Sequence, residues 1–215
     1  MKKLIFTTLL CAVAGAASSQ VALTFGVKAG ANFAKLSSNE DADARFRPGL
    51  HAGFFANVAF TDKLSFQPEL FYSAQGTKLA NNLDNSDEEN RRMLVNYVQV
   101  PLLLQYALTE KLSVQAGPQI GILLSAKRKW DGYWEEDGWD EEYTYIEEPD
   151  SDDIKEYFKT LDIGLGIGLG YKISERFGIY TRYTHGLTNM VKEQYLSPGE
   201  KEGNRVIAVG LSYSF

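Results

Sequence analysis

Few residues of this sequence are of the types that enzymes use for acid–base or nucleophilic chemistry. The chain has two histidines, His51 and His185, and one cysteine, Cys11. A hydrolytic site needs a general base beside an oriented nucleophile. Alternation along their segments places the two histidines on opposite faces, and no G-x-S-x-G, H-E-x-x-H or paired-histidine spacing occurs. We therefore expect no enzyme activity, no cofactor and no metal centre.

The densest group of potential ligand side chains lies between Asp131 and Asp153, a segment with twelve acidic residues and no basic one. The acids are interleaved with aromatic side chains that could anchor a partner: Trp134, Trp139, Tyr143 and Tyr145. The spacing does not match the calcium loop of an EF-hand. Two hypotheses stay open for residues 131–153: a solvated external loop, or a binding site for a divalent cation or a basic extracellular protein.

The clearest secondary-structure pattern in the sequence predicts a strand at residues 161–173. Its odd positions are all large and apolar, and its even positions are four glycines with Asp162 and Lys172. Glycines at every second residue do not fit the dinucleotide fingerprint G-x-G-x-x-G, whereas a period of two predicts a strand. A glycine-rich face suits a narrow barrel lumen, and the apolar face then points to lipid.

The same alternation recurs in seven further segments, so the chain is predicted to be all-β: an eight-stranded antiparallel up-and-down transmembrane β-barrel. The expected strands are residues 23–33, 50–60, 64–75, 94–108, 112–125, 161–173, 177–187 and 205–215. Proline removes a ladder donor, so we expect bulges or irregular pairing at Pro68, Pro101 and Pro118.

The connections alternate between short and long. Three short ones each carry a hydroxyl, an acid and a base, at residues 61–63, 109–111 and 174–176, whereas residues 35–49, 76–93, 126–160 and 188–204 form long loops. Outer-membrane barrels have short periplasmic turns and long external loops. Aromatic residues also gather on the apolar face beside the short turns, as in an interfacial girdle: Phe60, Phe66, Tyr106, Tyr171, Phe177, Tyr213 and Phe215.

Five charged residues are predicted to face the lumen: Lys28, Glu69, Asp162, Lys172 and Arg182. They could form an ion path or a ligand pocket. Eight strands leave space only for side chains, and buried charges must be paired, so we favour a structural polar network that plugs the lumen. This interpretation predicts negligible conductance.

Residues 1–19 have the pattern of a secretory signal peptide, with two lysines, an uncharged stretch over 4–17 and a cleavage site after Ser19. The uncharged stretch is too short to span a bilayer as a helix. Removal of the signal peptide would leave residues 20–215 as one barrel domain with 20 basic and 28 acidic residues, a net charge of −8. That charge and the lack of a basic cluster argue against nucleic-acid binding.

Several stretches together resemble the PorT-like outer-membrane β-barrel family of Gram-negative bacteria. They are GVKAGANFAKL (26–36), GLHAGFFANVAF (49–60), LSFQPELFYSAQGTKL (64–79), NYVQVPLLLQY (96–106), LSVQAGPQIGILLSAK (112–127), LGIGLGYKI (165–173), YTRYTHGLTNM (180–190) and NRVIAVGLSYSF (204–215). The resemblance implies the barrel fold and the outer membrane, and PorT itself is linked to protein secretion. It assigns no role to individual residues, although Phe215 resembles the C-terminal aromatic used in barrel assembly.

Three functions remain open from the sequence. The first is a monomeric integral outer-membrane barrel that contacts lipid and displays long external loops for adhesion, partner binding or envelope integrity. The second is a small pore or a protein-secretion accessory. The third is a soluble exported barrel that binds an apolar ligand.

Overall fold

The computed structural model describes residues 22–37, 45–78, 88–89, 91–137, 142–146, 150–196 and 202–215. The signal-peptide prediction for residues 1–19 lies outside the described residues. Within them, no helix is long and apolar enough to cross a bilayer.

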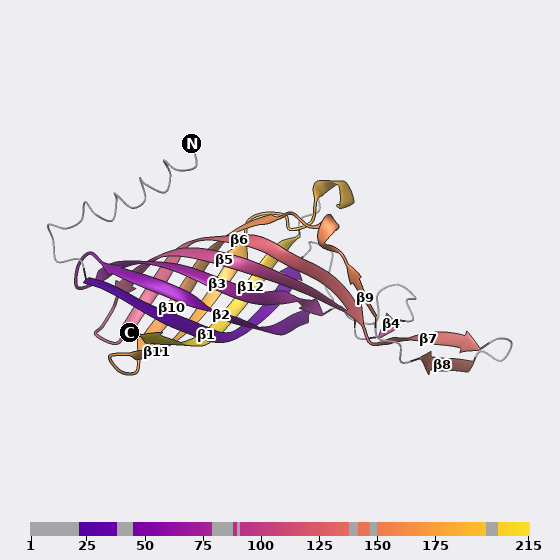
Figure 1. Cartoon of the computed structure of the whole chain (residues 1–215), viewed down its shortest axis with the longest axis horizontal. Helices are drawn as coiled ribbons and strands as arrows, with labels where there is room; N and C mark the ends of the chain where they lie inside the picture. The colour runs from indigo at the N-terminus through magenta and orange to yellow at the C-terminus, as the bar shows by residue number, and fades with distance from the viewer. Residues whose placement is uncertain are drawn as a thin grey trace.

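Eight strands close into an antiparallel barrel (Figure 1). They are β1 (Ala22–Ser37), β2 (Arg45–Ala59), β3 (Leu64–Lys78), β5 (Arg92–Ala107), β6 (Leu112–Trp130), β10 (Leu161–Lys172), β11 (Phe177–Gly186) and β12 (Gly203–Ser214). Each strand pairs with its neighbours in the chain, β1 pairs with β12, and β10 pairs with β6 across the long insertion between them. All eight predicted strands are confirmed. Several of them extend further on the long-loop side, into segments predicted as loops.

The insertion between β6 and β10 builds an extension on the long-loop end of the barrel. Strand β9 (Asp150–Asp153) adds to the end of β6, and β4 (Glu88–Glu89), β7 (Gly132–Asp137) and β8 (Glu142–Ile146) form a small separate sheet. Two 3-10 turns, η2 (Lys155–Tyr157) and η3 (Glu193–Tyr195), follow β9 and β11. Figure 1 shows the β7–β8 hairpin projecting beyond the barrel, at the end away from the C-terminus.

The three short turns have one structure because they share one residue pattern. In each, the first residue's hydroxyl oxygen accepts a hydrogen bond from the backbone N–H three residues later: Thr61 from Leu64 at 3.0 Å, and Thr109 from Leu112 at 2.9 Å. Ser174 accepts one from Phe177 at 3.1 Å. The hydroxyl closes the turn without help from neighbours, so this end of the barrel is fixed locally.

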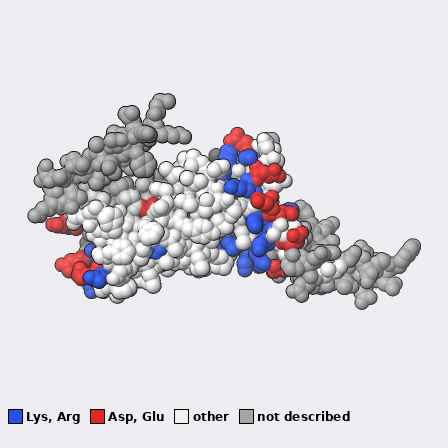
Figure 2. Space-filling model, viewed as in Figure 1, with Lys and Arg blue, Asp and Glu red and all other residues white. Residues whose placement is uncertain are grey.

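Side chains on the barrel strands alternate between the lumen and the exterior, as the sequence predicts. The outward side chains are large, apolar and exposed: Leu50 is 72% exposed, Ile167 63% and Leu211 61%. The face of the barrel in Figure 2 has a matching, largely uncharged band, with charged residues gathered at its two ends. A soluble barrel around an apolar ligand would place such side chains inside, so that alternative is wrong. The apolar surface fits the hydrocarbon of a bilayer.

The expected bulges are absent at Pro68, Pro101 and Pro118, but the expected irregular pairing is present. One ladder is interrupted at each proline: Pro68 is unpaired with Ala56, Pro101 with Glu69, and Pro118 with Leu102. Pairing runs in one register from Pro68 opposite Leu102 to Phe71 opposite Gln99, and Pro118 lies in a continuous ladder with β10. Pro101, opposite Gln119, is likewise passed without a shift. A missing donor removes one ladder bond, and the bonds on either side hold the register. The two register shifts lie nearer the long loops, between Phe46 and His51 and between Asn96 and Tyr97.

Candidate functional site in the barrel lumen

The middle of the lumen is filled by one buried carboxylate and two buried cations. Lys28 of β1 donates to Glu69 of β3 at 2.6 Å. Arg182 of β11 approaches the same carboxylate with two nitrogens, at 2.7 Å to Oε2 and 2.9 Å to Oε1. All three residues are at most 5% exposed. A paired, hydrogen-bonded arrangement is the form in which buried charges are tolerated.

Uncharged neighbours complete the hydrogen bonding of this group. Gln67 donates to Glu69 at 2.7 Å, and Arg182 also donates to Gln115 of β6 at 2.9 Å. The Lys28 ammonium lies 4.6 Å from the ring centroid of Tyr180, within cation–π range. We call Lys28, Glu69, Arg182, Gln67 and Gln115 the lumen plug. It joins four strands across the barrel and obstructs the middle of the lumen.

Glycines make the space that the plug requires. A Cβ built on Gly166 would lie 3.3 Å from Cδ of Arg182, and one on Gly210 would lie 2.9 Å from the Tyr180 hydroxyl. Both glycines face the lumen, beside the two longest side chains of β11. The glycine-rich face at residues 161–173 therefore accommodates the Arg182 side chain of the neighbouring strand β11.

A second polar network lies nearer the long-loop end. Asn32 donates to Ser73 at 2.8 Å, and Gln75 donates to the same hydroxyl at 2.9 Å. Asn204 is hydrogen-bonded to Gln75, which links β12 to β3. His51 contacts the Tyr180 hydroxyl between this network and the plug, so its imidazole is enclosed among barrel side chains.

The other two charged residues predicted for the lumen lie apart from the plug. Asp162 is buried towards the long-loop end, where its carboxylate accepts a hydrogen bond from Thr188 at 2.7 Å. Lys172 is exposed at the short-turn end. The two occupy opposite ends of β10, ten residues apart, which is about 30 Å of strand. One network could not have contained both.

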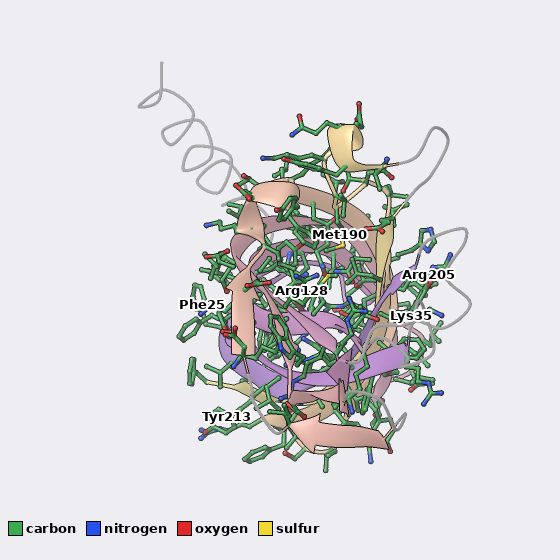
Figure 3. All side chains as sticks on the ribbon, turned by 90° about the vertical axis from the view of Figure 1, so that its right-hand side faces the viewer. Phe25, Lys35, Arg128, Met190, Arg205 and Tyr213 are labelled. Atoms are coloured by element: carbon green, nitrogen blue, oxygen red, sulfur yellow. The ribbon has the colours of Figure 1, made fainter. Side chains whose placement is uncertain are left out.

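Apolar side chains close the long-loop end of the lumen. Val95, Tyr97, Leu123 and Ala126 point inward from β5 and β6 and pack with Ile154, Phe158 and Met190 from the connections. Figure 3, viewed from this end, shows Met190 within the outline of the strand ring and Phe25 and Tyr213 pointing outward. Sequence reasoning missed this cap. A usable signal was present, because the inward positions of β5 and β6 change from glutamine to apolar residues towards this end.

The connections are tied to the barrel and to each other by backbone hydrogen bonds. Ile154 donates to the Ala126 carbonyl at 3.0 Å, and Lys159 donates to the Met190 carbonyl at 2.7 Å. Phe158 and Val191 form a β-bridge. Parts of the loops predicted at 126–160 and 188–204 are therefore folded over the lumen.

The short-turn end is open. A vestibule of about 370 Å³ reaches from the turns to Lys28, at the edge of the plug. Its wall combines hydroxyls and amides, including Ser65, Ser113 and Gln105, with charged and apolar side chains, and Lys172 is among the charged ones. This size and polarity suit water or a small polar solute.

The acidic segment 131–153 is only partly described. The backbone of its two strands, β7 and β8, pairs from Tyr133 opposite Ile146 to Asp137 opposite Glu142. The side chains of Trp134, Tyr143 and Tyr145, and the whole of Trp139, lie outside the described residues. Among the described residues, no three potential metal ligands cluster.

Comparison with known proteins bears on the fold and the family. A family model described as outer membrane protein beta-barrel domain matches residues 17–192. Strand β12 lies beyond the matched range, and in the structure it closes the barrel against β1. No curated protein sequence matches the chain.

Solved barrels resemble the chain in structure at low identity. Neisserial surface protein A is 12% identical with a TM-score of 0.50, over 90% of this chain and 99% of that one. The attachment invasion locus protein Ail of Yersinia pestis, in complex with the heparin analogue sucrose octasulfate, is 12% identical with a TM-score of 0.49, over the same shares. OprG of Pseudomonas aeruginosa is 16% identical with a TM-score of 0.42, over 91% and 97%.

Proposed function

Because this chain belongs to the outer membrane protein beta-barrel domain family, we propose that it is a membrane-anchored scaffold that meets its partner through its external extension. The protein is an integral outer-membrane β-barrel with an apolar exterior in contact with lipid. We also propose that the protein is monomeric, that the signal peptide at residues 1–19 directs its export from a Gram-negative cytoplasm, and that it has no catalytic activity.

Two features of the molecule support this role: side chains fill the lumen, and additional strands form an extension outside the barrel. The lumen plug and the apolar cap occupy the interior in succession, whereas β6 continues to Trp130 and leads into β7, β8 and β9 outside the barrel. The pairing of β6 with β10 ends at Ile122, and β9 pairs with the end of β6 from Lys127 opposite Asp153 to Trp130 opposite Asp150. Such an ordered extension suits presentation to a partner.

The chemistry of the extension favours a cationic partner. Twelve acids and five aromatic residues lie in residues 131–153. Carboxylates attract a basic surface or a divalent cation, and tryptophan and tyrosine supply the buried anchors typical of protein interfaces. We propose this segment, with Trp134, Trp139, Tyr143 and Tyr145, as the site for a basic extracellular protein or a divalent cation.

The register between β6 and β9 allows a clean test. Trp130 lies directly opposite Asp150, so an Asn-Gly turn can replace residues 131–149 and close the hairpin. We expect the shortened protein to fold and to keep the unfolding temperature of the full chain. Calorimetry of the full chain with calcium chloride and with a lysine-rich peptide should give heat for at least one, and the shortened protein should give none.

Two results would count against this role. If the full chain binds neither probe, the acidic segment is only a solvated surface. If the shortened protein no longer shows the heat-dependent gel shift of a folded barrel, residues 131–149 belong to the scaffold and not to a displayed site. Mutating Trp134 and Trp139 to alanine in the full chain separates an aromatic anchor from attraction by charge alone.

The vestibule supports a second candidate, an accessory role on the periplasmic side. It opens at the short-turn end, holds about 370 Å³ and has polar groups in its wall. This candidate also accords with the resemblance to the PorT-like family, which is linked to secretion. A secretion defect on deletion of the gene that full-length protein rescues, but K172E does not, would favour it. Equal rescue by both would favour the display role.

A further inference from the structure

Basic side chains face outward in a row at the long-loop end of the barrel. Cross-strand partners in this row carry the same charge: Arg45 is opposite Lys78, Lys78 is opposite Arg92, and Arg92 is opposite Lys129. On the other side of the barrel, Lys35 of β1 is opposite Arg205 of β12. We call Lys35, Arg45, Lys78, Arg92, Lys129 and Arg205 the cationic belt.

Such pairing is unfavourable for the isolated protein. Side chains directly opposite on neighbouring strands are about 5 Å apart at Cβ, and like charges there destabilise a sheet. Arg92 has a carboxylate partner, Asp131, at 2.6 Å. Within the described part of the chain, Lys35, Lys78, Lys129 and Arg205 have no ion-pair partner. The belt therefore has a surplus of positive charge that an external anion would stabilise.

The belt lies where the head groups of one leaflet must be. Along β1, the girdle residue Phe25 and the belt residue Lys35 are ten residues apart, and both face outward. Ten residues of a strand tilted by about 40° rise roughly 25 Å, which equals the apolar band of an outer-membrane barrel. If the aromatic girdle marks the periplasmic interface, Lys35 and its partner Arg205 mark the external one, and Arg92 and Lys129 lie further out on strands β5 and β6.

The direction of these side chains favours lipid over a soluble anion. Figure 2 shows Lys and Arg at the loop-side end of the uncharged band, with Asp and Glu among and beyond them, and Figure 3 shows Lys35 and Arg205 at the outer edge of the strand ring. They extend from the barrel wall directly above the lipid-facing surface. Arginine and lysine bind phosphate oxygens through charge-assisted hydrogen bonds, and each adds to the attraction towards an anionic membrane surface.

We propose that the cationic belt binds the phosphate groups of anionic lipid in the external leaflet, with Lys35 and Arg205 as one site and Lys78 and Lys129 beside Arg92 as another. The lipid neutralises the facing like charges and holds the barrel at a fixed depth. The proposal rests on the membrane placement of the barrel and is independent of what the acidic segment binds.

The test uses the full chain, folded in zwitterionic detergent, with diphosphorylated lipid A as the probe. Native mass spectrometry measures its dissociation constant for the wild type, for the double variant Lys35→Gln/Arg205→Gln, and for Lys63→Gln/Lys111→Gln at the opposite end of the barrel. Two charges near a membrane surface correspond to a loss of about 30-fold in affinity for the belt variant. The short-turn control should keep the wild-type affinity, and dephosphorylated lipid A should bind all three proteins weakly.

A stability measurement separates lost binding from lost folding. Without lipid A, the belt variant should unfold at the wild-type temperature or above it, because two facing like charges are gone. With lipid A, only the wild type and the control should gain stability. If the first variant fails to fold, Lys78→Gln/Lys129→Gln provides the same comparison on the other side of the barrel.

Three outcomes overturn the proposal. The belt variant could bind lipid A as tightly as the wild type. The wild type could bind phosphorylated and dephosphorylated lipid A equally. A soluble sulfated polysaccharide could bind the belt while lipid A does not, which would make the belt a surface for a soluble polyanion.

Discussion

Replacing Glu69 with glutamine removes the carboxylate that both lumen cations face. The side chain of Glu69 is fully buried and receives four hydrogen bonds, from Lys28, Gln67 and twice from Arg182. Glutamine preserves the shape but loses the charge, and its amide would point a donor at one of the donors that surround it. Two cations would then remain in the lumen without a counter-ion.

Removing one partner of a buried ion pair typically costs about 3–5 kcal/mol, and we expect Glu69→Gln to lower the free energy of unfolding by that amount. The assay is urea unfolding of the barrel in lipid vesicles, followed by the gel-mobility difference between the folded and the unfolded barrel. Lys172→Gln is the matched control, because this exposed lysine lies outside the plug and should change stability by less than about 0.5 kcal/mol.

A rescue variant sharpens the test. The triple change Lys28→Met, Glu69→Gln and Arg182→Met removes both uncompensated cations and should recover most of the loss, because apolar replacements of a whole buried network are often neutral. If Glu69→Gln stays within about 1 kcal/mol of the wild type, the lumen is wetter than its contacts indicate and the plug does not stabilise the barrel.

Three further predictions test other parts of the lumen. In planar bilayers the wild type should show negligible conductance, and large stable channels would contradict a lumen filled by the plug and the cap. Phe158→Ala should cost about 3–5 kcal/mol, because Phe158 is 4% exposed within the apolar cap, whereas Tyr195→Ala, at a side chain 49% exposed, should cost far less. Gly210→Ala should destabilise by about 1–3 kcal/mol, because its Cβ would lie 2.5 Å from the Ala29 carbonyl oxygen and 2.9 Å from the Tyr180 hydroxyl. Gly170→Ala, which would displace only the Ser113 hydroxyl, is its control in the same unfolding assay, and equal losses for the two glycines would contradict the packing argument.

Much of the barrel could be predicted because its strands and short turns have patterns that can be recognised in a few neighbouring residues. The alternation at residues 161–173 assigned Leu165 to the exterior and Gly166 to the lumen without knowledge of any neighbour. The three hydroxyl–acid–base turns were equally local, since Thr61, Thr109 and Ser174 each close their own turn. These features depend on residues within a few positions of one another.

The candidate site was less predictable because its contacts cross the lumen. Lys28 and Glu69 are 41 residues apart, and Glu69 and Arg182 are 113 apart. Which inward residues meet depends on the stagger between strands and on how the barrel closes. The apolar cap was missed for the same reason, because Phe158 and Met190 become core residues only when their connections fold back over the opening.

The sequence by itself determined which face of each strand meets lipid and which end of the barrel has short turns, because a strand's side chains alternate whatever it pairs with. Only the tertiary structure decided that Glu69 binds Lys28 and Arg182 while Lys172 stands apart. It also placed basic residues from six strands in one external belt. Those arrangements are set by register and closure, which are properties of the whole barrel and not of any single strand.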